Sequence, residues 1–128
     1  MNTLKTLSVL GISLAIAACA PKLPTSGTPS IYDGQWVGEM TGNRVACQGI
    51  TVKFEVRYSQ ILGESYYNGA READFWGEIL PGGKLAANIG KAGISGATAD
   101  VQFTKNNGTG TWKSGSCQGD VKVRRAGS

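Results

Sequence analysis

The sequence predicts an all-β fold, an antiparallel up-and-down meander of about eight strands that closes into a small barrel with one disulfide. Apolar and polar residues alternate with a period of two from residue 31 onward, which is typical of strands with one buried face. Glycine-rich turn signals follow one another at short intervals, as in sandwiches and barrels. The positions of Cys47 and Cys117 favour closure of the sheet. Residues 31–128 therefore form one β domain.

The most regular alternation runs from Ile50 to Tyr58, where every second residue is apolar or aromatic and the others are threonine or charged. This pattern indicates an antiparallel strand with one face buried and one in water. Turn signals such as Asn68-Gly69 and Pro81-Gly82-Gly83 bound the other segments. The predicted strands cover residues 35–41, 50–58, 61–68, 73–80, 84–90, 95–104, 108–113 and 117–125.

Glycine is frequent, with 19 in the chain, and three predicted strands share the pattern apolar, Gly, Glu. These are Val37-Gly38-Glu39, Leu62-Gly63-Glu64 and Trp76-Gly77-Glu78. Glycine inside a strand marks a bend or a close approach of two backbones, and small coiled barrels need such positions. Coincidence in a glycine-rich chain is the alternative.

The first 18 residues have the composition of a secretory leader, which we expect to be helical. Lys5 is their only charge, and Leu7 to Ala18 form an apolar core of about a dozen residues, too short to span a bilayer. The sequence Ile16-Ala17-Ala18-Cys19 at its end resembles the lipobox of bacterial lipoproteins. This resemblance implies that Cys19 receives a diacylglycerol, that the leader is removed and that the new amino group is acylated, for instance with palmitate.

A plain secretory leader with an accidental cysteine is the alternative. The chain has three cysteines, however, and an exported chain with an odd number has one left over after pairing. Lipidation gives Cys19 a use, and several acyl chains anchor a protein stably. By the same resemblance, Ala20 in place of aspartate indicates the outer membrane. Residues 19–30, with Pro21, Pro24 and Pro29, then form a lipidated, semi-extended tether.

Cys47 and Cys117 are expected to pair in the oxidising cell envelope. One precedes the second predicted strand and the other begins the last strand, so an eight-stranded meander places both at the same end. They can meet only if the first and last strands are neighbours, which favours a closed barrel. A sandwich with the bridge across its edge is the alternative.

The first and last strands carry a further pattern. Gly34-Gln35-Trp36 opens the first strand, and Arg124-Arg125 ends the last. This arrangement resembles the calycin superfamily, which includes lipocalins, avidins and small bacterial metalloprotease inhibitors. The resemblance implies that Arg124 or Arg125 lies across the barrel floor on the face of Trp36, a cation–π contact.

The chain offers little material for catalysis, and we expect no enzyme activity, no cofactor and no metal site. Histidine is absent from the sequence, which excludes histidine-based nucleophilic catalysis, and paired cysteines cannot bind zinc. Glu39, Glu64 and Glu78 are predicted to share the outer, solvated face. The formal net charge is +4 without a basic run beyond Arg124-Arg125, so we expect no nucleic-acid partner.

Four aromatic residues flank the turn predicted around residues 69–72: Tyr66, Tyr67, Phe75 and Trp76. A three-residue loop would place Tyr66 opposite Trp76 outside the barrel and Tyr67 opposite Phe75 inside it, whereas a two-residue loop would change this pairing. An exposed Tyr66–Trp76 pair would form a patch for a protein partner. Ordinary cross-strand stabilisation is the alternative.

These features predict a lipoprotein of the cell envelope, anchored by Cys19, with a non-enzymatic binding or structural barrel and an envelope protein as partner. One alternative, from the calycin resemblance, is a periplasmic protease inhibitor, in which the segment 22–30 would enter the protease cleft. The other is a carrier of a small apolar ligand. A packed interior would exclude the carrier, and an empty pocket of a few hundred cubic ångströms would support it. The sequence predicts no oligomeric state.

Overall fold

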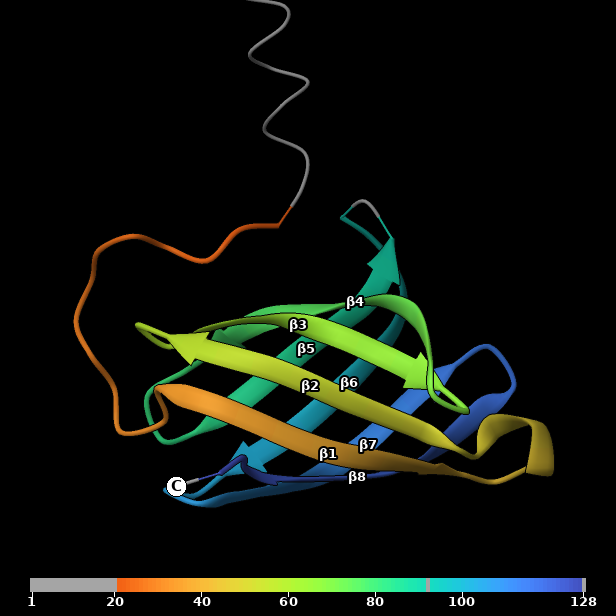
Figure 1. The fold of residues 1–128 in the computed structure, drawn as a ribbon. Helices are drawn as coiled ribbons and strands as arrows, with labels where there is room; N and C mark the ends of the chain where they lie inside the picture. Colours follow the sequence, from red (N-terminus) through yellow and green to blue (C-terminus); the bar gives the residue numbers. More distant parts are fainter. Residues whose placement is uncertain (1–20, 92, 128) are drawn as a thin grey trace, which may run out of the picture.

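The computed structural model describes residues 21–91 and 93–127, and of Ile94 the backbone only. The predicted leader and Cys19 lie outside these residues. The domain is a closed antiparallel barrel of eight strands in sequence order, which confirms the predicted fold class (Figure 1). The strands are β1 (Gly34–Gly42), β2 (Ile50–Arg57), β3 (Gln60–Tyr67), β4 (Ala70–Ile79), β5 (Lys84–Lys91), β6 (Ile94–Phe103), β7 (Asn107–Ser114) and β8 (Cys117–Arg125). A short 3-10 turn, η2 (Val45–Cys47), lies between β1 and β2.

The first and last strands close the barrel. Gly38 of β1 lies opposite Val52 of β2 on one side and opposite Val123 of β8 on the other. Cys47 and Cys117 form the predicted disulfide, with 5.8 Å between their Cα atoms. The bridge therefore joins the β1–β2 connection to the start of β8, and the sandwich alternative does not apply.

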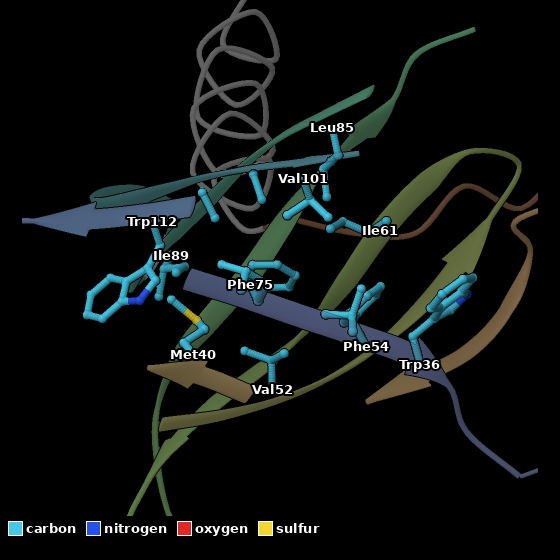
Figure 2. Close-up of a cluster of buried hydrophobic side chains, with 14 of the residues drawn as sticks. Trp36, Met40, Val52, Phe54, Ile61, Phe75, Leu85, Ile89, Val101 and Trp112 are labelled. Carbon is cyan, nitrogen blue, oxygen red and sulfur yellow. The ribbon is translucent and has the colours of Figure 1, made fainter. Parts of the chain in front are cut away.

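The period-two alternation sorts residues to the two sides of the sheet. In β2, Val52, Phe54 and Val56 are buried, while Thr51 and Lys53 are exposed. Side chains from all eight strands meet inside the barrel and form one hydrophobic cluster (Figure 2). Burial of these apolar surfaces is the main force that favours the folded state.

The hairpin between β3 and β4 differs most from the prediction, because β4 begins at Ala70 rather than at residue 73. Asn68 and Gly69 have φ values of 50° and 86°, which suit a tight two-residue hairpin turn. The pairing of β3 with β4 then shifts by one residue between Ser65 and Tyr66. Because of this bulge, the later β4 residues still alternate as predicted, with Phe75 facing inward and Trp76 facing outward.

Two strand glycines show why the barrel needs residues without side chains. A Cβ atom at Gly63 would collide with the backbone oxygen of Lys53, and one at Gly110 would collide with that of Asp100. Neighbouring strands thus approach each other closely at these points, as the repeated strand glycines predicted.

Residues 21–33, which we call the strap, run past one end of the barrel before β1 begins (Figure 1). They contain neither helix nor strand, as expected for a tether. They nevertheless lie against the barrel, because a Cβ atom at Gly27 would be 2.8 Å from the Cβ of Tyr58. Pro21 lines an open surface pocket together with Leu62, Glu64 and neighbouring residues of β3 and β4.

Candidate functional site

The two ends of the barrel differ in how they are filled. We call the end that holds Trp36 the floor and the end that holds the disulfide the mouth. At the floor, the Trp36 ring stacks on Phe54 at 6.2 Å and meets Phe103 edge-on at 5.0 Å between ring centroids. Phe75 continues this aromatic cluster towards the middle of the barrel, 5.2 Å from Phe54. The floor half is therefore packed with large rigid rings (Figure 2).

Arg125 covers this cluster from outside. Its guanidinium carbon lies 4.9 Å from the centroid of the Trp36 ring, a cation–π distance. The same guanidinium donates hydrogen bonds to the backbone oxygens of Lys105 at 2.8 Å, Asp33 at 2.7 Å and Ile31. Of the two candidate arginines, the structure thus places Arg125 on Trp36, while Arg124 lies outside and pairs with Glu39 at 3.3 Å.

Asp33 fastens the strap to the floor. Its carboxylate accepts hydrogen bonds from the Ser30 hydroxyl at 2.7 Å and from the backbone N–H groups of Tyr58 at 3.0 Å and Ser59 at 3.3 Å. Burial raises the pKa of this carboxyl, but the hydrogen bonds outweigh burial and hold the pKa below its ordinary value. Tyr58 and Ser59 form the β2–β3 turn with φ values of 51° and 66°, so Asp33 stabilises a left-handed turn without glycine.

The mouth is not filled in the same way. A cavity of about 210 Å³ opens there. The side chains that line it are mostly apolar, and several of them are small, which leaves room between the larger ones. The lining includes Met40, Ile50, Ser65, Ala73, Ile89, Ala97 and Trp112, together with both disulfide cysteines. The barrel is thus closed at the floor and hollowed at the mouth.

A few polar groups lie in the wall of the mouth cavity. Ser65 lines it and is the one buried polar residue, 4% exposed, in the part of the chain that the structure describes. Glu72 and Tyr67 contribute to the lining from the β3–β4 hairpin. Trp112 uses its indole N–H on the backbone oxygen of Thr41, at 2.9 Å, so its ring is fixed in the cavity wall. A mostly apolar cavity with a few polar groups is the usual form of a small-molecule site.

The predicted aromatic patch is arranged differently from the three-residue-loop prediction. Because the turn has two residues, Tyr66 lies opposite Arg71, and Trp76 lies opposite Leu62. Tyr66 and Trp76 both remain half-buried on the outer face, and Phe75 points inward. The Tyr66 hydroxyl donates to the Glu64 carboxylate, which raises the pKa of Tyr66, and the Lys53 amine lies 5.7 Å from its ring. The two aromatic residues thus do not form a directly opposed pair.

The three glutamates predicted to share the outer face lie on separate strands, Glu39 on β1, Glu64 on β3 and Glu78 on β4. Each occupies the outer face. Within residues 21–91 and 93–127, no group of three or more His, Cys, Asp or Glu side chains could hold a metal ion. In the same residues, no helix combines the length and apolarity needed to cross a membrane.

Sequence reasoning missed three residues that shape these ends: Asp33, Ser65 and Ala97. Ser65 and Ala97 could have been recognised because each has a small side chain at a position that alternation turns inward. Small inward side chains leave space inside a barrel. Asp33 lies just before the first strand, where its distant partners at the β2–β3 turn could not be recognised.

The fold and its two ends define a small, disulfide-bridged, closed antiparallel β-barrel with a packed floor and a hollow mouth. No protein-family model matches the chain, and neither a curated protein nor a solved structure matches it.

Proposed function

We propose that the chain is a lipoprotein of the cell envelope, anchored through Cys19 in the outer membrane, whose barrel is a non-enzymatic binding module. The observation that carries this proposal is the pairing of Cys47 with Cys117. Disulfides persist in oxidising compartments, so the bridge supports export from the cytoplasm. It also uses two of the three cysteines and leaves Cys19, at the end of an apolar leader, for lipid.

Metabolic labelling with a palmitate analogue tests the anchor. The full chain should incorporate the label and Cys19→Ser should not. The double variant Cys47→Ser/Cys117→Ser is the matched control, because it replaces the other two cysteines by serine and should keep the label. Undiminished labelling of Cys19→Ser would disprove lipidation at this residue.

Membrane fractionation tests the compartment. The full chain should separate with the outer membrane, and Ala20→Asp should remain with the inner membrane. Equal distribution of the two proteins would contradict the proposed sorting.

The mouth cavity favours a second function, the binding of a small apolar ligand. An enclosed apolar cavity of about 150 Å³ already accepts benzene in a well-studied protein, and the mouth cavity is about 210 Å³. A compact apolar molecule with one hydroxyl or amino group would suit walls that include Ser65 and Glu72.

Titration with indole, followed by the NMR shifts of the methyl groups of Met40 and Ile89, tests the cavity. Ala97→Leu, which adds volume at the cavity wall, should weaken the shifts. Ala86→Leu adds the same atoms on the exposed outer face and should not. Shifts that are identical in both variants would place the indole elsewhere.

The protease-inhibitor alternative requires the segment 22–30 to enter a protease cleft. In the structure, Gly27 lies against Tyr58, and residues 24–30 face the β2–β3 and β4–β5 turns. The segment would have to leave the floor to act, so the geometry favours the binding module over the inhibitor.

A further inference from the structure

The outer surface of the barrel has one side that differs from the rest. Leu62 of β3 and Trp76 of β4 lie directly opposite each other on the outside, and Tyr66 follows on the same face of β3. We call the outer side of β3 and β4 around these three residues the β3–β4 face. Across the barrel, the outward residues of β6, β7 and β8 are threonine, glutamine, aspartate, lysine and arginine. They include Thr98, Asp100, Gln102, Thr109, Thr111, Lys113, Gln118, Asp120, Lys122 and Arg124, all exposed.

The strap leads to the β3–β4 face. From β1 it passes the floor at Gly27 and Tyr58. Its first described residue, Pro21, lines a surface pocket on the outside of β3 together with Leu62, Gly63 and Glu64. Pro21 and Leu23 are half-buried, while the strap residues between Thr25 and Pro29 are exposed. In Figure 1 the orange start of the strap lies on the side of the barrel where β3 and β4 lie. The described part of the chain thus begins on the side of the barrel where the outer residues of β3 and β4 include Leu62, Tyr66 and Trp76.

The length of the chain ahead of Pro21 then limits the position of the anchor. Cys19 is two residues from Pro21, and a fully extended chain spans at most about 3.6 Å per residue. A lipid on Cys19 would therefore start within about 7 Å of Pro21. A barrel held this closely has little freedom to turn other faces towards the bilayer.

We propose that the β3–β4 face lies against the phospholipid surface when Cys19 carries its lipid. The inference rests on the proposed lipidation and adds an orientation to it. The barrel lies on its side, with the polar outer face of β6 to β8 turned away from the membrane and available to a partner.

The chemistry of the face suits the zone of lipid headgroups. Tryptophan and tyrosine have an apolar ring and a polar tip, and they are enriched where membranes meet water. Lys53 and Arg71 provide cations beside Tyr66. Arg71 pairs with Asp74 at 2.5 Å, however, and Glu64 accepts the Tyr66 hydroxyl. Charges are thus nearly balanced, so the face orients an anchored barrel and does not recruit a free one.

Quenching of tryptophan fluorescence by brominated lipids tests the orientation. Trp36 and Trp112 are buried, at 1% and 5% exposure, so Trp76 is the tryptophan that a bromine atom can reach from outside. Full-length chain, purified from membranes and shown by mass to carry lipid on Cys19, is reconstituted in vesicles of phosphatidylcholine with bromines near the headgroup. Emission should be lower than in vesicles of unbrominated phosphatidylcholine, and Trp76→Phe should remove most of the loss.

A tryptophan on the opposite face is the matched control. In the Trp76→Phe background, Thr111→Trp places an indole on the outer side of β7, and its emission should not fall in brominated vesicles. Equal quenching from positions 76 and 111 would show that the barrel turns freely, and absence of quenching at position 76 would show that this face does not lie on the bilayer. Either result would overturn the inference.

Mass spectrometry of the purified chain, which shows whether Cys19 carries lipid, distinguishes failure of the anchor from failure of the orientation. A chain without lipid disproves the anchor, whereas a lipidated chain without quenching at position 76 disproves only the orientation. The quenching of the wild-type chain needs no substitution, so the test does not depend on a variant that folds poorly.

Discussion

Arg124 and Arg125 are adjacent in sequence, but strand alternation places their side chains on opposite sides of the sheet. Arg125 stacks on Trp36 and donates to three backbone carbonyls that belong to the strap and to the β6–β7 turn. Arg124 makes one exposed ion pair. A lysine would keep the charge at either position, but it lacks the planar group that stacks and donates in several directions.

Arg125→Lys should therefore lower the free energy of unfolding by about 2 kcal/mol, because the floor carbonyls lose charged donors. Arg124→Lys should change it by less than about 0.5 kcal/mol. Urea unfolding with unchanged m-values measures both. Similar losses in the two variants would show that the contacts of Arg125 do not matter for stability.

Asp33 predicts a dependence of stability on pH. Its pKa in the folded chain is below the ordinary value, so its contribution is present above about pH 4 and is lost as pH falls through the folded pKa. Asp33→Asn should thus be less stable than the wild type at pH 7, with the difference shrinking as pH falls below about 4. Asp100→Asn, on the exposed outer face, is the control. A difference that is constant from pH 7 to pH 2 would exclude the charge of Asp33 as its cause.

At the scale of strands, residue alternation predicted most of the architecture. In the segment from Ile50 to Arg57, the apolar residues of the sequence pattern are the ones that face inward. The two cysteines indicated that the first and last strands are neighbours. The hairpin at Asn68-Gly69 was harder, because its pairing depends on the loop length and on a bulge at Ser65 and Tyr66, both set by tertiary packing.

The mouth cavity could not be predicted for a related reason. Alternation shows that Ser65 and Ala97 face inward, but it does not show how far along the barrel axis the aromatic rings extend. Shear between strands brings side chains that are distant in sequence into one layer. The interior residues could therefore be predicted from the sequence, but the volume of the cavity between them could not.

The strand glycines give a prediction at this scale. Gly110→Ala should lower the free energy of unfolding by about 1 to 3 kcal/mol, because a Cβ atom there collides with the backbone of Asp100 on β6. Gly96→Ala is the matched control within the sheet, since its Cβ would be 3.9 Å from the nearest atom, the backbone oxygen of Ile89. Thermal or urea unfolding compares the two. Equal stability of both variants would show that the close approach of β6 and β7 can relax at no cost.

For the whole molecule, the disulfide links residues 70 apart and lies at the end of the barrel that the aromatic cluster does not fill. It ties the β1–β2 connection to β8 next to the hollow mouth. In the chain-entropy model, a loop of this length contributes about 4 kcal/mol by restricting the unfolded chain.

The double variant Cys47→Ser/Cys117→Ser should accordingly unfold with a free energy about 3 to 4 kcal/mol lower than the wild type. Reduction of the wild-type chain should lower its stability by a similar amount. Urea titration with and without a reducing agent measures both effects. If reduction further destabilises the double variant, the loss in the wild type does not come from this bridge alone.

The pairing of β1 with β8 also sets the order in which the molecule is able to assemble. Gly34–Gly42 is synthesised before Cys117–Arg125, so β1 cannot pair with β8 until the other strands of the barrel have been made. Until then, β1 and β7 each present an open edge to which a strand of another chain can bind. A chain cut before β8 would be an open sheet with two edge strands whose backbone groups are unpaired, and Cys47 would lack its partner. Such a chain would be prone to aggregate and to form mixed disulfides.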